Sequence, residues 1–220
     1  MNKEWSELNK KTQLLLRKKD TFTDGISVCL KLRNTLSDAV EKLCDKLSDE
    51  QYSLMPYPDA NGYHCKTIAY SIWHIARIED ITAHTLICGD EQVLFGDDYL
   101  KATCSPIITT GNELVRDEIT AFSQSLNITG LLRYAADVKE STNELLSRLS
   151  YEDSKRRFTS DDKERVIASK SVSEDKNAVW LIDYWCGKDI TGIIKMPFAR
   201  HLIMHIEAMM RIAGKIGIEI

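Results

Sequence analysis

Apolar residues recur at steps of three and four positions over long stretches of this chain, and this spacing restricts the fold more than any other feature. Between residues 24 and 49 the apolar residues that follow these steps are Cys29, Leu32, Leu36, Val40, Leu43 and Leu47. Because an α-helix completes a turn in 3.6 residues, these side chains fall on one face of a helix. Asp24 stands where an N-cap residue is expected. We therefore predict a long amphipathic helix over 24–49.

Two other stretches show the same periodicity. One extends from about residue 65 to 88 and stops at Gly89, a residue typical of helix C-termini. The other begins near Thr129, which suits an N-cap, and ends at about residue 149. A shorter helix is expected over 113–126. Three long helices and one shorter one are thus predicted before the C-terminal part of the chain is reached.

The C-terminal part contains a charged segment followed by two apolar ones. Residues 151–176 are more than half charged, so we predict a solvated connection that adds little to the core, with a short element at 165–168. A short buried helix is predicted over 178–185. Gly192 and Pro197 are expected to bracket a turn, and Pro197 suits the first position of a final long helix.

These elements predict an all-α protein. We find no strand pattern, repeat or phosphate-binding glycine loop in the sequence. Four long helices with extra short ones and one long connection are typical of a four-helix bundle. The 220 residues, 43% of them hydrophobic, are enough for one sizeable core. We assign residues 24–220 to a single helical-bundle domain and residues 1–23, which are polar and lysine-rich, to an N-terminal arm.

Composition excludes several classes of partner. The net charge is −4 and charged residues make up 28% of the chain with both signs interspersed, so no footprint for nucleic acid or an anionic membrane is present. No apolar stretch reaches the ~20 residues of a membrane span, and no secretory signal begins the chain. We expect a cytoplasmic protein. The six cysteines show no CxxC pairing and are expected in the core rather than in disulfides.

The histidines predict a metal site. His201 and His205 are four residues apart on the last predicted helix, so their rings are separated by one turn and about 40° and both can reach one ion. Two such histidines can also lie on a surface or form hydrogen bonds within a core. Here both share the apolar side of the helix, where a divalent cation would satisfy ring nitrogens that are costly to bury unpaired. His74, at the margin of the apolar face of helix 65–88, is the best third ligand. His84 lies on the polar side of that helix and His64 lies in a loop, which makes both poorer candidates.

Three further residues, one acidic and two aromatic, are considered for a role near the predicted site. Glu79 falls on the apolar face of helix 65–88, where it could accept a hydrogen bond from a ligand ring or act as a catalytic proton-transfer group beside the ion. A pair with a buried arginine such as Arg77 or Arg200 is the alternative. Trp180 and Tyr184, spaced by four residues, are expected to pack in the core.

Four short motifs together resemble a known family. They are SIWHIARIED at 71–80, DYW at 183–185, MP at 196–197 and RHLIMH at 200–205. In these motifs and in their order the chain is similar to the DinB/YfiT-like superfamily of metal-dependent enzymes, over about residues 24–216. The resemblance implies a four-helix bundle in which one histidine of the second helix and an HxxxH pair of the last helix bind a divalent metal. In this chain those residues are His74, His201 and His205.

The resemblance also implies a class of reaction. The superfamily includes thiol-dependent S-transferases and isomerases, and dimers are common in it. We therefore expect a transferase or hydrolase in which zinc or nickel lowers the pKa of a bound water or thiol, with a low-molecular-weight thiol as one small-molecule substrate. Two alternatives stay open: a non-enzymatic stress-associated or phage-associated binding protein, and a metal that serves only as a structural staple.

Overall fold

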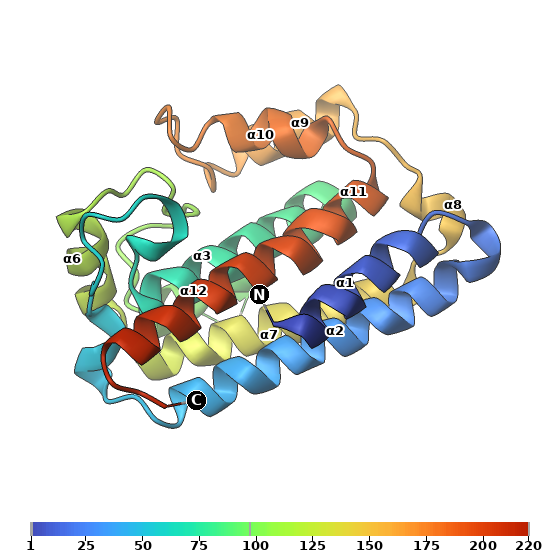
Figure 1. Cartoon of the computed structure of the whole chain (residues 1–220). Coiled ribbons are helices and arrows are strands. Elements are labelled where there is room, and N and C mark those ends of the chain that lie inside the picture. Colours follow the sequence, from blue (N-terminus) through green and yellow to red (C-terminus); the bar gives the residue numbers. More distant parts are fainter. Residues whose placement is uncertain (1, 97, 220) are drawn as a thin grey trace.

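The computed structural model describes residues 2–96 and 98–219, and four long helices that lie side by side make up its body (Figure 1). They are α2 (Phe22–Cys44), α3 (Ile68–Asp80), α7 (Ile128–Arg148) and α12 (His201–Lys215). The predicted N-terminal arm contains α1 (Lys3–Leu15), which packs along α2. No β-strand occurs in the part of the chain that the structure describes, so the prediction of an all-α protein is confirmed.

Shorter elements connect the long helices. The α-helices among them are α4 (Val93–Gly96), α5 (Tyr99–Ala102), α6 (Asp117–Ser125), α8 (Tyr151–Ser154), α9 (Ser160–Ala168), α10 (Trp180–Cys186) and α11 (Ile190–Lys195). The 3₁₀ turns are η1 (Lys19–Thr21), η2 (Asp49–Ser53) and η3 (Gly62–His64), and the π-helical segments are η4 (Ile81–Cys88) and η5 (Met196–Arg200). Within the described residues, every helix is too short or too polar to cross a lipid bilayer.

The helix N-termini differ from the prediction by a few residues. The first long helix begins at Phe22 and ends at Cys44, so Asp24 lies in its first turn and is not its cap. The helix predicted to begin near Thr129 begins at Ile128 and is capped by Asn127, whose side-chain oxygen accepts a hydrogen bond from the Gly130 amide at 2.8 Å. Asn is among the best N-cap residues because its short side chain reaches this amide.

The second long helix continues beyond α3 in a wider form. Thr67 caps its start by accepting a hydrogen bond from the Tyr70 amide, and η4 extends it to Cys88 with π-helical geometry. Gly89, at φ +72°, ends the helix with its amide bound to the carbonyl of His84 at 2.7 Å. The predicted stop at Gly89 is therefore confirmed, and its left-handed backbone explains why glycine stands there.

The predicted turn between Gly192 and Pro197 is wrong. The chain is helical from α11 through η5 into α12, and Pro197 lies in the first turn of the π-helical segment η5. Proline has no amide hydrogen and its ring collides with the carbonyl four residues earlier. A π turn accommodates such a residue without ending the helix. His201 thus follows directly on a distorted but continuous helix.

The charged segment 151–176 contributes more to the core than its composition predicts. Its helix α9 packs against η4, and Val166 on that helix is fully buried. The short element expected at 165–168 is the end of this longer helix, Ser160–Ala168. The prediction of a connection outside the core is therefore wrong, because burial of the Val166 side chain packs an otherwise polar helix against the core.

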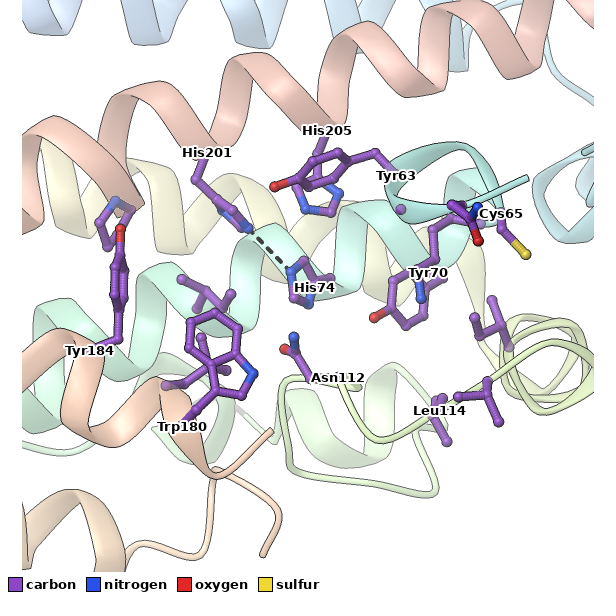
Figure 2. A pocket seen from close by; sticks show the side chains of 18 of the residues that line it. Tyr63, Cys65, Tyr70, His74, Asn112, Leu114, Trp180, Tyr184, His201 and His205 are labelled. Atoms are coloured by element: carbon purple, nitrogen blue, oxygen red, sulfur yellow. Dashed lines mark hydrogen bonds between the residues drawn. The ribbon is translucent and has the colours of Figure 1, made fainter. Parts of the chain in front are cut away.

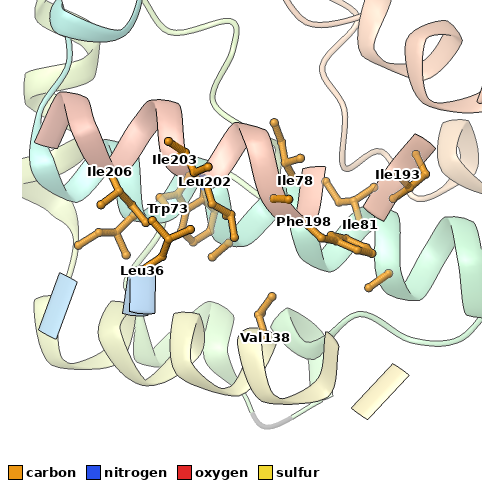
Figure 3. Close-up of a cluster of buried hydrophobic side chains, with 14 of the residues drawn as sticks. Leu36, Trp73, Ile78, Ile81, Val138, Ile193, Phe198, Leu202, Ile203 and Ile206 are labelled. Carbon is orange, nitrogen blue, oxygen red and sulfur yellow. The ribbon is translucent and has the colours of Figure 1, made fainter. Parts of the chain in front are cut away.

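Apolar side chains from all four long helices meet between them (Figure 3). Those drawn include Leu36, Trp73, Ile78, Ile81, Val138, Phe198, Leu202, Ile203 and Ile206. Among the six cysteines, all free, only Cys29 is fully buried, and Cys88 and Cys104 are exposed. The expectation that the cysteines lie in the core is thus correct for Cys29 and wrong for the two exposed ones.

Candidate metal centre

Three histidine side chains from two helices point toward one another (Figure 2). His74 extends from α3, and His201 and His205 extend from α12. One ring nitrogen of each lies within 4.8 Å of the others, and Nε2 of His74 is 3.2 Å from Nε2 of His201. All three are buried. The structure therefore brings together the residues that the sequence predicted as a ligand set, although His74 and His201 are 127 positions apart in the chain.

A backbone carbonyl fixes the protonation of His74. Its Nδ1 lies 2.8 Å from the carbonyl oxygen of Thr110. Because a carbonyl can only accept, Nδ1 carries the hydrogen and Nε2 presents a lone pair toward the other two rings. Metal-binding histidines in proteins are commonly held in this way by a carbonyl at the second nitrogen.

Several nitrogens in the cluster have no hydrogen-bond partner among the described residues. They are Nδ1 of His201 and both ring nitrogens of His205, all of them buried. A hydrogen bond between His74 and His201 would leave His205 unpaired, whereas a cation would accept a lone pair from each ring. Two nitrogens that bind one tetrahedral zinc at about 2.0–2.1 Å lie roughly 3.3 Å apart, close to the separation of the His74 and His201 nitrogens. The donor set therefore fits a divalent ion.

Burial keeps the three rings neutral. It lowers the pKa of His74 to about 4, and it lowers the pKa values of His201 and His205 well below their usual range. Neighbouring positive charge, including Lys66 for His74 and His205, adds to this effect. Since only a neutral imidazole binds a metal, the lone pairs are available at neutral pH.

A pocket of about 540 Å³ opens on the three rings. Aromatic side chains form much of its wall: Tyr70 stacks on His74 with centroids 5.6 Å apart, and Tyr63 stands edge-on to His205 at 4.7 Å. Trp180 and Tyr184 of α10 line the other side (Figure 2). The prediction that these two pack in the core is wrong for Trp180, which is 50% exposed.

Polar groups in the pocket were not predicted from the sequence. Lys66 lines it with its ammonium 4.5 Å from the centre of the Tyr70 ring, and Asn112 lies across from His74 (Figure 2). Arg116, at the N-cap of α6, also lines it. The helices predicted over 65–88 and 113–126 included Lys66 and Arg116, but α3 begins at Ile68 and α6 at Asp117, so both residues lie just before a helix, where helical spacing does not give the direction of a side chain. They become neighbours of the histidines only through the path of the connecting loops.

Glu79 lies elsewhere. Its carboxylate forms a bidentate pair with Arg33 of α2, with Oε1 2.6 Å from Nη2 and Oε2 3.0 Å from Nη1, and both side chains are buried. The paired arginine is therefore neither of the two named as alternatives, Arg77 and Arg200. Glu79 is not one of the described residues that line the pocket of the three histidines. It lines a second cavity, beside α2 and α7.

The two other histidines form separate contacts. Nδ1 of His84 lies 2.8 Å from Asp90 Oδ1 and its Nε2 lies 2.9 Å from Ser141 Oγ, while His64 contacts Arg211. A serine, histidine and aspartate in this order occur in hydrolases, but Ser141 lies inside α7, where backbone amides are engaged within the helix and cannot bind an oxyanion. We interpret this group as a structural link between η4 and α7.

No family model matches the chain, and no curated protein matches it. The resemblance to the DinB/YfiT-like superfamily therefore stays a prediction from its motifs.

Helix α3 also holds the loop that orients His74. Four consecutive carbonyls, those of residues 108–111, accept hydrogen bonds from side chains of this helix: Ile108 from Arg77, Thr109 from Trp73, Thr110 from His74 and Gly111 from Tyr70. Arg77 and Asp80 of this helix are fully buried, and Nη1 of Arg77 lies 2.8 Å from Oδ2 of Asp80. These side chains of α3 thus bind the loop at 108–111.

Proposed function

We propose that this chain is a divalent-metal-dependent enzyme of the DinB/YfiT-like four-helix-bundle type, with His74, His201 and His205 as its metal ligands. The observation that carries the proposal is the convergence of three buried, neutral imidazoles, two of which have nitrogens without any other partner. Zinc or nickel is the expected ion because imidazole suits both.

The arrangement favours a reaction over a purely structural role. A structural zinc site has four protein ligands, whereas the group found among the described residues has three and faces a pocket. When bound at such a site, a divalent ion lowers the pKa of a water or thiol that contacts it. Aromatic side chains line the pocket, and Thr110 keeps His74 in the tautomer that leaves Nε2 free. The family resemblance favours transfer of a low-molecular-weight thiol, or hydrolysis, as the reaction.

Metal content tests the proposal. We expect protein purified without chelator to contain about one equivalent of zinc or nickel per chain, and chelator-treated protein to gain thermal stability when either metal is added. His205→Ala should lose the metal and keep its helical content, while His84→Ala, which alters a histidine outside the pocket, should keep the metal. Absence of bound metal together with no thermal shift would contradict the proposal, as would unchanged metal content in His205→Ala.

A further inference from the structure

The pocket beside the three histidines carries positive charge that forms no ion pair with residues 2–96 or 98–219. Lys66 and Arg116 line it, and among the described residues of its wall none has a carboxylate. Buried or half-buried cations usually have an anionic partner, because an unpaired charge is costly to remove from water. The wall therefore lacks a negative group that its positive groups would stabilise.

Lys66 differs in this respect from the two buried arginines. Arg33 is paired with Glu79, and Arg77 is paired with Asp80. The half-buried Lys66 has a cation–π contact with Tyr70 and forms no ion pair with the described residues. Tyr70 in turn stacks on His74, so the ammonium lies one aromatic ring away from the histidine cluster. An anionic group bound at Lys66 would thus lie next to the metal ligands.

The rim of the same pocket is apolar and exposed. Trp180, Val115 and Tyr63 are 50%, 50% and 39% exposed, and all three line the pocket. Large exposed apolar side chains gathered around one cavity are typical of a binding site for an apolar group. The pocket therefore offers a cationic interior and an aromatic mouth.

We infer that this pocket binds a small carboxylate with an aromatic or apolar body, its carboxylate against Lys66 and its body between Tyr63 and Trp180. The inference rests on the proposed function, because that function makes the pocket a substrate site. It adds the chemical class of the substrate. A charge-assisted hydrogen bond in a partly desolvated site contributes enough to discriminate an acid from its neutral amide about tenfold.

Binding of two matched probes tests this. Calorimetric titration of the chelator-treated full chain with 2-naphthylacetate and with 2-naphthylacetamide should give about tenfold tighter binding of the acid. Lys66→Met should reduce this preference to less than about twofold, because it removes the positive charge. Lys66→Arg should retain most of the preference, because it keeps that charge. Equal affinity of the unaltered protein for the two probes would overturn the inference without need of any variant.

Lys139→Met is the matched control. Lys139 is also half-buried and lines the second cavity of the molecule, the apolar one that contains Glu79. This variant should keep the full acid preference. Loss of preference in Lys139→Met with its retention in Lys66→Met would locate the carboxylate in the second cavity and overturn the inference.

The two proposals can fail separately. Zinc content of Lys66→Met should equal that of the unaltered protein, since Lys66 is not a ligand. A chain that binds no metal but prefers the acid would contradict the metal function alone. A chain that binds zinc at the three histidines but does not distinguish the probes would contradict the substrate class alone.

Discussion

At the scale of single residues, burial decides which protonation state each ring takes. His74 has a pKa of about 4 in the folded protein, against 6.5 for an exposed imidazole, mainly because the buried ring cannot be solvated when charged. The unfolded chain takes up this proton at a higher pH than the folded one. Stability contributed by the neutral ring is therefore complete above pH 6.5 and is lost as the pH falls toward 4.

We predict that chelator-treated protein becomes less stable between about pH 6.5 and pH 4. One imidazole with the shift of His74 accounts for about 3 kcal/mol of the free energy of unfolding over this range. Urea denaturation at a series of pH values measures the loss, and His74→Asn should show a shallower dependence. A free energy of unfolding that stays constant from pH 7 to pH 4.5 would argue against buried neutral rings.

The ion pair with Arg33 determines the surroundings of Glu79. Its carboxylate neutralises Arg33, which also donates to the carbonyl of Phe198 at 3.2 Å, within the π segment that leads to His201. This geometry shows that Glu79 holds the guanidinium of Arg33 in place, and the catalytic role predicted for Glu79 stays a prediction.

Removal of either partner should therefore destabilise the chain more than removal of both. We expect Glu79→Met to lower the free energy of unfolding by about 3–5 kcal/mol, because it leaves Arg33 charged and buried. The double variant Arg33→Met with Glu79→Met should lose less than the sum of the two single losses. Denaturant unfolding of the four proteins measures this coupling. Strictly additive losses would contradict the pairing, and normal stability with lost activity in Glu79→Met would restore its catalytic interpretation.

At the scale of elements, α3 organises the site through its contacts with the loop at 108–111. Arg77 is the strongest of these contacts because its guanidinium donates twice to the carbonyl of Ile108 and also pairs with Asp80. The loop carries the carbonyl of Thr110, so its position controls the orientation of His74.

We predict that Arg77→Met lowers the free energy of unfolding by about 3–5 kcal/mol and weakens zinc binding about tenfold or more. Tyr70→Phe, which removes one hydrogen bond to the same loop, should cost only about 1–2 kcal/mol. Denaturant unfolding and competition with a zinc-binding dye measure the two effects. Zinc affinity unchanged in Arg77→Met would show that the loop does not orient His74.

At the scale of the whole molecule, the helical spacing was sufficient to predict an all-α chain and to bring His74, His201 and His205 together. These predictions succeeded because periodicity fixes the face on which a residue lies. The pairing of Glu79 with Arg33, the pocket position of Trp180 and the continuous helix through Pro197 could not be predicted. Each depends on which distant segment packs against the residue, and local spacing does not contain that information.

The proposed ligands and the pocket wall facing them come from different parts of the chain. His74, His201 and His205 stand on two long packed helices, whereas Asn112, Arg116 and Trp180 belong to connecting segments and a short helix. Insertions and deletions are tolerated far more readily in connections than in packed helices. Proteins that evolve from this chain could thus come to bind another class of small molecule through changes in the connections, while the three imidazoles keep their spacing.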